Sequence, residues 1–145
     1  MEKLYSALNV QISNWSVLYT KLHRYHWYVK GPNFFALHAK FEELYNEAAN
    51  VVDEAAERLL AIGGKPVSTM QEYLNTSTLT EDTAPATASE MVANLAADYT
   101  QLKKELEDLA ALAADQNDDL TNDFAVGLMA TLDTQIWMFN AYLGE

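Results

Sequence analysis

The sequence contains no cysteine, which excludes disulfide bonds, thiolate metal sites and cysteine nucleophiles. No apolar run approaches the ~18 residues of a membrane-spanning helix, and the first residues lack the basic and apolar regions of a signal peptide. Motifs of the G-x-G-x-x-G, P-loop, G-x-S-x-G and H-E-x-x-H types are also missing. No motif therefore supports a function in the common nucleotide-binding or hydrolase classes. We therefore expect a protein that is neither exported nor membrane-bound.

Basic residues are scarce in this sequence. Nine Lys and Arg stand against 21 Asp and Glu, which gives a net charge of 9 − 21 = −12 at pH 7. Such a charge repels nucleic acids and anionic membrane surfaces and attracts cations. Hydrophobic residues make up 50% of the 145 positions, enough for one domain with its own core. We expect a single domain over residues 1–145 that handles cations.

Glycine and proline are few as well, with five and three residues, and they separate segments of helical periodicity. Apolar residues recur every three or four positions over residues 4–26, which predicts a first helix that ends at Gly31-Pro32. A second helix is expected from about Phe34 to Ile62. Gly63-Gly64 follow it and can take the left-handed conformation that ends a helix.

The segment of about twenty residues after the second helix is rich in Ser, Thr and Pro and too long for a simple connection. A capping box at Thr69 and Glu72, or at the pair one residue earlier, predicts a short helix over Met70–Asn75. Two further long helices are expected, with apolar seams at Met91, Leu95, Leu102, Leu106 and Leu109 and at Leu120, Phe124, Leu128, Leu132, Ile136, Phe139 and Leu143. Four long helices with one long crossover predict an all-α, ferritin-like four-helix bundle, with the short extra helix between helices two and three.

The residues with the clearest chemical potential lie together in the stretch 23–58. It contains all three histidines, His23, His26 and His38, and then Asp53 and Glu57 at the spacing that puts two carboxylates on one helix face. Neutral imidazole and carboxylate together suit iron, zinc or manganese. Each residue alone also has an ordinary interpretation, as a half-buried core histidine or as part of a solvated acidic face.

The positions along the second helix limit how these residues can combine. His38 and Asp53 are 15 residues apart, which is about 22 Å at 1.5 Å per residue. Either they form no common site, or the histidines of one chain meet Asp53 and Glu57 of another across a two-fold axis between antiparallel helices. His38 and both carboxylates lie roughly 90–180° from the centre of the predicted core stripe. That stripe consists of Leu37, Phe41, Leu44, Ala48, Val52, Ala55, Leu59 and Ile62.

The same stretch contains a longer pattern: His26-Trp27, Gly31, Phe35, Leu37-His38, Asp53, Ala56-Glu57-Arg58 and Ile62-Gly63. With these intervals it resembles the Dps-like (DNA-binding protein from starved cells) branch of the ferritin-like superfamily, and the resemblance extends over essentially the whole chain. It implies an intersubunit ferroxidase centre formed by His26, His38, Asp53 and Glu57. It further implies a cytoplasmic, hollow homododecamer, with sites at two-fold interfaces, that oxidises Fe(II), preferably with hydrogen peroxide, and stores the ferric product.

The resemblance also suggests roles for residues around that centre. Trp27 would lie near it and could absorb stray oxidising equivalents. Asp118, Asp119 and Asp123 would line a three-fold pore for iron entry, although carboxylates at a helix start are also explained by the helix dipole.

Three glutamates, Glu42, Glu43 and Glu47, can be plain surface charge, but the resemblance implies that some of them face the cavity and nucleate mineral. Ala39 stands where many relatives carry another glutamate, which weakens the expected nucleation.

Two other functions stay open at this point. Some Dps-like proteins compact DNA, but the charge of −12 and the absence of a basic terminal tail lead us to expect no DNA binding. The other alternative is a helical bundle whose histidines and carboxylates are purely structural.

Overall fold

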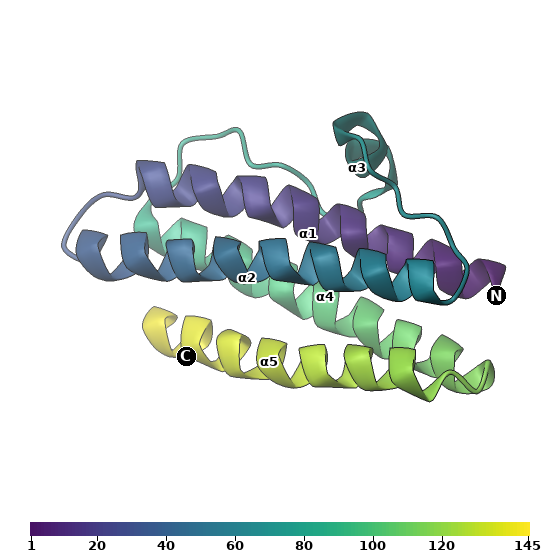
Figure 1. Ribbon diagram of the computed structural model, residues 1–145. Helices are drawn as coiled ribbons and strands as arrows, with labels where there is room; N and C mark the ends of the chain where they lie inside the picture. The colour runs from purple at the N-terminus through teal and green to yellow at the C-terminus, as the bar shows by residue number, and fades with distance from the viewer. The chain divides into compact units, whose positions relative to one another are not determined.

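The computed structural model describes residues 1–145, all in helices and their connections, with no β-strand. The helices are α1 (Glu2–Tyr28), α2 (Phe34–Ala61), α3 (Met70–Thr76), α4 (Ala88–Asp115) and α5 (Asp119–Leu143) (Figure 1). The four predicted long helices and the short helix in the crossover are all present, with bounds within a few residues of those expected. None of the helices is both long and apolar enough to cross a lipid bilayer.

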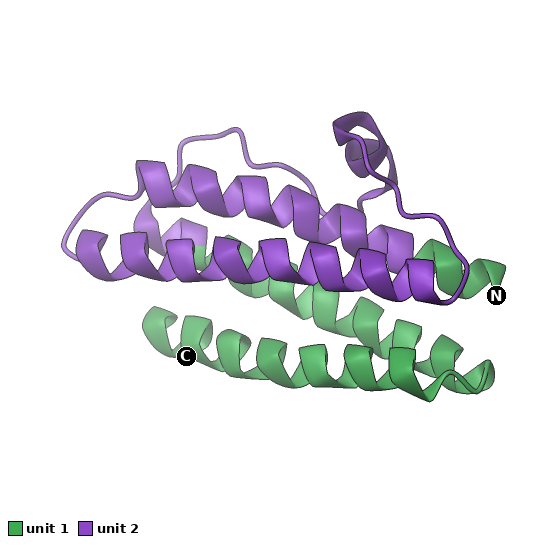
Figure 2. Ribbon diagram, viewed as in Figure 1, with its two compact units in different colours: residues 1–7, 92–145 green, residues 8–91 purple.

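The chain divides into two compact units (Figure 2). Residues 8–91 form one unit, which holds most of α1 together with α2, α3 and the crossover; residues 1–7 and 92–145 form the other, which holds most of α4 and α5. Each unit contains one helical hairpin and is described by itself below. The expectation of a single domain stays a prediction.

In the 8–91 unit, α1 and α2 form an antiparallel hairpin. Gly31 in the connecting turn has a φ of +107°, a left-handed conformation that glycine adopts at little cost. Residues late in α1 contact residues early in α2: the rings of Tyr25 and Phe41 lie 5.9 Å apart. Further along, Tyr19 and Tyr45 are also 5.9 Å apart. This pairing brings the end of α1 against the beginning of α2.

One predicted core position of α2 is wrong. The buried residues are Leu37, Phe41, Leu44, Ala48, Val51, Ala55 and Leu59, so Val51 takes the place expected for Val52. Both valines lie within about 60° of Ala48 around the helix axis, one at i+3 and the other at i+4, so periodicity alone does not choose between them. Val52 and Ile62 are half-buried.

The crossover is fastened to α1 by side-chain hydrogen bonds. The buried Asn14 accepts from the backbone N–H groups of Thr78 (2.7 Å) and Leu79 (3.2 Å) and donates to the Thr78 hydroxyl (2.9 Å). Nearer the other end of the unit, the Tyr25 hydroxyl donates to Asp82 over 2.6 Å. The long crossover therefore follows α1 along a defined path.

Both helix starts around the crossover use capping boxes. At α3, the backbone N–H of Glu72 donates to the Thr69 hydroxyl, and that of Thr69 donates to the Glu72 carboxylate. Thr87 and Glu90 form the same reciprocal pair at the start of α4. Because a capping box depends only on residues three apart in the chain, the Thr69 box could be predicted from sequence.

The 92–145 unit is a second antiparallel hairpin, formed by α4 and α5. The rings of Tyr99 and Phe139 meet edge to face at 5.1 Å, and Lys103 forms an ion pair with Asp133. Every residue of the predicted α4 seam is buried. The predicted α5 seam is wrong in part: the buried residues of α5 are Thr121, Ala125, Leu132, Gln135 and Phe139.

Leu120, a predicted seam residue of α5, is 67% exposed. Four other residues of the predicted α5 seam are half-buried: Phe124, Leu128, Ile136 and Leu143. Apolar residues occur around most of the circumference of α5, so the sequence pattern does not single out one face.

Candidate metal centre

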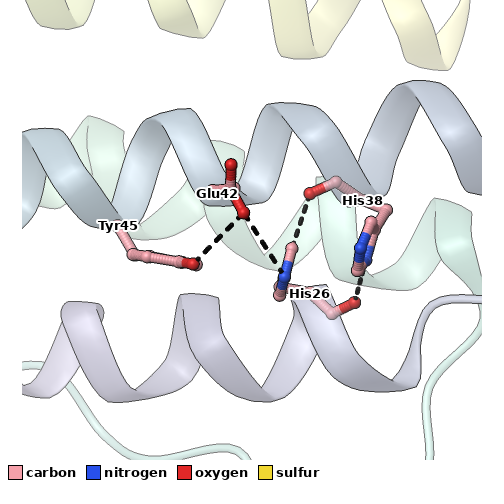
Figure 3. A network of polar contacts seen from close by, with 4 residues as sticks. All are labelled: His26, His38, Glu42 and Tyr45. Carbon is pink, nitrogen blue, oxygen red and sulfur yellow. Dashed lines mark hydrogen bonds and ion pairs between the residues drawn. The ribbon is translucent and has the colours of Figure 1, made fainter.

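His26 and His38 face each other across the α1–α2 hairpin (Figure 3). His26 lies in the last turn of α1, and His38 lies near the beginning of α2. Their rings stack with centroids 3.7 Å apart and planes 10° from parallel. His26 is only 7% exposed, and His38 is half-buried. The structure thus brings these two predicted site residues together within one chain.

Each of the two imidazoles is oriented by the backbone of the other. Nδ1 of His26 lies 2.6 Å from the carbonyl oxygen of His38, and Nδ1 of His38 lies 2.7 Å from the carbonyl oxygen of His26. A carbonyl oxygen can only accept, so both Nδ1 atoms carry a proton and donate. In the neutral imidazole this leaves the lone pair on Nε2, the atom that is then available to a metal ion.

Glu42 lies one turn after His38 and directs its carboxylate at His26. Its Oε1 is 3.8 Å from the His26 Nε2, and the Tyr45 hydroxyl donates to the same oxygen over 3.4 Å. Two donors about 2.1 Å from one ion are about 3.0–3.8 Å apart for angles of 90–130° at the metal. His26 and Glu42 therefore have a spacing that a single cation can bridge.

A cluster of aromatic rings adjoins this network. His23 stacks on Tyr45 with centroids 3.8 Å apart, Tyr19 meets His23 edge-on at 4.5 Å, and Trp27 lies 5.1 Å from His23. We refer to Tyr19, His23, Trp27 and Tyr45 as the ring cluster. Trp27, which is 68% exposed, is connected to the histidine pair through this cluster.

The sequence analysis assigned no role to two members of this arrangement, His23 and Tyr45. The available signal was their spacing. His23 precedes His26 by three residues and Tyr45 follows His38 by seven, so each lies one or two helical turns from a candidate ligand on the same helix.

The two predicted carboxylate ligands, Asp53 and Glu57, lie far from the histidine pair. Both are exposed on α2, and Asp53 is about 22 Å along the helix from His38. No group of three or more His, Asp or Glu residues that could hold a metal ion occurs in the chain. A single chain therefore supplies two separate halves of the predicted centre.

The aspartates proposed for the pore differ from one another. Asp118 is the N-cap of α5 and accepts hydrogen bonds from the backbone N–H (3.0 Å) and the hydroxyl of Thr121. Asp119 and Asp123 are exposed. The helix-start interpretation thus accounts for Asp118 directly.

The three glutamates on α2 also have different surroundings. Glu42 faces His26, whereas Glu43 forms an ion pair with Lys40 at 3.6 Å. Glu47 is half-buried, and burial raises its carboxyl pKa, as does the charge of Glu43. These residues do not form one uniform acidic patch.

Comparison with known proteins extends these observations. The sequence family described as ferritin-like domain matches residues 5–145. The "DNA protection during starvation protein 2" of Bacillus anthracis is 47% identical over 144 residues, which cover 99% of each chain. The chain belongs to the Dps family of ferritin-like proteins.

Solved Dps structures agree closely with this one. Staphylococcus aureus Dps is 48% identical with a TM-score of 0.97, over 99% of this chain and 96% of that chain. Listeria innocua Dps, in a crystal soaked with zinc, is 39% identical with a TM-score of 0.95, over 98% and 97% of the two chains. The predicted fold class, a ferritin-like four-helix bundle with a short helix in the crossover, is confirmed.

Proposed function

We propose that this Dps-family protein is a ferroxidase and iron store. Two-fold-related subunits of a cytoplasmic, hollow dodecamer would share each centre, with His26 and His38 from one subunit and Asp53 and Glu57 from its partner. Fe(II) would be oxidised there, preferably by hydrogen peroxide, and the ferric product kept inside. The observation that carries this proposal is the histidine pair, oriented through Nδ1 with Nε2 available, together with the exposed carboxylate pair that lies far from it along α2.

The proposed ligand set suits the change in oxidation state. Imidazole nitrogen binds Fe(II) well, while the harder carboxylate oxygens stabilise Fe(III) and so favour oxidation. Two Fe(II) ions reduce one hydrogen peroxide to two water molecules with the uptake of two protons. Iron and peroxide are removed together, which limits the formation of hydroxyl radical.

Glu42 is a further candidate ligand on the histidine side of the centre. Its 3.8 Å separation from the His26 Nε2 supports this role better than the mineral nucleation expected from the sequence. Glu43 and Glu47 stay candidates for nucleation. Trp27 is a candidate for uptake of stray oxidising equivalents, because the ring cluster connects it to the histidine pair.

Iron entry is assigned to the exposed Asp119 and Asp123, with Asp118 beside them. We regard Asp118 mainly as the residue that fixes the start of α5, because it is engaged with Thr121. A ring of such carboxylates around a three-fold axis would attract Fe(II) electrostatically.

The shared centre predicts that two inactive variants restore each other. One variant has both His26 and His38 replaced by Gly, and the other has Asp53 and Glu57 replaced by Ala. Each alone should be nearly inactive, because every interface centre lacks half of its ligands. Disassembly and co-refolding of an equal mixture should restore roughly a quarter of wild-type activity, since about half of the dimers are mixed and each has one intact centre of two. Fe(II) oxidation by peroxide, followed by ultraviolet absorbance, measures this.

Two controls make the mixing experiment decisive. Each variant refolded alone should stay inactive, and Glu54→Ala, which removes a neighbouring exposed carboxylate of α2, should keep full activity. A co-refolded mixture as inactive as its parents would refute the shared centre.

A second candidate function is DNA compaction, which fits in part the name of the Bacillus anthracis relative, a DNA protection protein. The net charge of −12 opposes it, because binding to DNA requires several Lys or Arg contacts to phosphate.

A further inference from the structure

Glu42 is the most exposed member of the network around the histidine pair. Both imidazoles are fixed by backbone carbonyl groups, whereas the Glu42 side chain is 55% exposed and has several rotatable bonds. An exposed glutamate loses rotamer freedom when it binds a metal ion, and that loss weakens the binding. Another group must therefore hold the Glu42 carboxylate near the His26 Nε2 if these two ligand atoms are to be oriented before a metal ion binds.

The Tyr45 hydroxyl is the group placed to do so. It donates to Glu42 Oε1, the same oxygen that faces the His26 Nε2 (Figure 3). The hydrogen bond is long, at 3.4 Å, and the Tyr45 ring that carries the hydroxyl packs against three neighbouring rings. Its ring stacks on His23 at 3.8 Å and meets Tyr19 and His26 edge-on at 5.9 and 5.4 Å.

His23 completes this support. Its Nδ1 lies 3.1 Å from the carbonyl oxygen of Tyr19, one turn earlier in α1, which fixes the plane of the imidazole. The ring then presents a flat surface to Tyr45, only 18° from parallel. The third histidine of the chain therefore supports Tyr45, and the two others are left as ligand candidates.

We propose that Tyr45 is a positioning residue, whose hydroxyl holds the Glu42 carboxylate against His26 so that a metal ion meets a pre-oriented nitrogen and oxygen pair. This inference rests on the proposed function, because it concerns the same centre.

Tyr45→Phe removes the hydroxyl and keeps the ring on His23. In the assembled protein, Co(II) should bind this variant about tenfold more weakly, the lower end of the loss seen when a group that orients a metal ligand is removed. Calorimetric titration and the visible absorption of bound Co(II) measure this without iron oxidation. Tyr73→Phe, on α3 and outside the ring cluster, is the matched control and should bind like the wild type.

A double-mutant cycle separates positioning from a general structural effect. Glu42→Ala removes the ligand that Tyr45 is proposed to hold. In that background, Tyr45→Phe should cause no further loss of Co(II) affinity, because the hydroxyl has nothing left to orient. Thermal unfolding should be the same for the wild type and Tyr45→Phe.

Two results would overturn the inference while leaving the proposed function intact. One is wild-type Co(II) affinity in Tyr45→Phe, and the other is an equal loss with and without Glu42, which indicates a structural role. A wild-type protein that neither binds Co(II) nor oxidises Fe(II) would instead refute the proposed function, and this inference with it.

Discussion

The hydrogen bond from Tyr25 to Asp82 makes the stability of the 8–91 unit depend on pH. The Tyr25 hydroxyl, with help from the Ala84 N–H and the charges of Lys21 and Arg24, holds the pKa of the Asp82 carboxyl below its usual value. A depressed pKa in the folded state stabilises the protein above the unfolded pKa, about 3.9. That stabilisation is lost as pH falls through the folded pKa.

Tyr25→Phe should therefore destabilise the protein at pH 7 by about 1 kcal/mol, a modest value because Asp82 is only half-buried. The difference from the wild type should shrink below about pH 4, where the carboxylate becomes protonated. Denaturant unfolding at pH 7 and pH 3, at one fixed protein concentration, measures both values. Tyr28→Phe, at an exposed tyrosine of the same helix, is the control. A pH-independent difference would show that Asp82 is not the partner that matters.

At the level of single residues, the sequence was enough to choose candidate ligands but not to predict how their side chains are held. The spacing along the chain was enough to select His26 and His38 as candidates. The predicted turn between the first two helices was enough to expect them close together. Their reciprocal bonds to backbone carbonyls could not be predicted, because those depend on how the two helices are positioned by the turn. The roles of His23 and Tyr45 depend on the same packing.

Among the connecting elements, the crossover is bonded to α1 through Asn14. Asn14→Leu would remove the Asn14 acceptor from the backbone N–H groups of Thr78 and Leu79, of which the Leu79 N–H keeps a second acceptor, the Ser77 hydroxyl. Amide hydrogen exchange at Thr78 should become about tenfold faster or more, equivalent to a loss of at least about 1.4 kcal/mol in local opening free energy, with a smaller increase at Leu79.

Hydrogen exchange followed by mass spectrometry, on peptides spanning the crossover, tests this expectation. Peptides from the middle of α4 serve as the internal reference and should exchange as in the wild type. Unchanged exchange at residues 78 and 79 would show that other contacts anchor the crossover.

Helix boundaries were the most predictable feature of the elements. The box at Thr69 and Glu72 and the glycines after α2 are local signals, and they mark the observed helix limits. Which face is buried was less predictable. Leu120 on α5 was expected to be buried but is exposed. The sequence could not identify the buried face of this helix, because apolar residues occur around most of its surface.

For the whole molecule, the charge of −12 predicts that the protein does not bind DNA directly. Each phosphate contact requires a Lys or Arg, and the surrounding negative charge adds repulsion. Plasmid DNA should migrate unchanged in a gel at physiological salt and neutral pH in magnesium-free buffer. Retarded plasmid under these conditions would revive the DNA-compacting function. A related protein with known DNA affinity, run in parallel, shows that the assay detects binding.

Three of the four proposed ligands, His38, Asp53 and Glu57, lie on α2, and the spacing between them restricts how the gene can change. Deletion of one codon between His38 and Asp53 would move the carboxylates about 1.5 Å along the helix and 100° around it relative to the histidines. In a two-fold assembly, that one deletion would misalign both centres of the dimer. Substitutions in the same interval leave the spacing intact. Descendants of this gene should therefore differ in which residues lie between His38 and Asp53, while the number of residues in that interval stays the same.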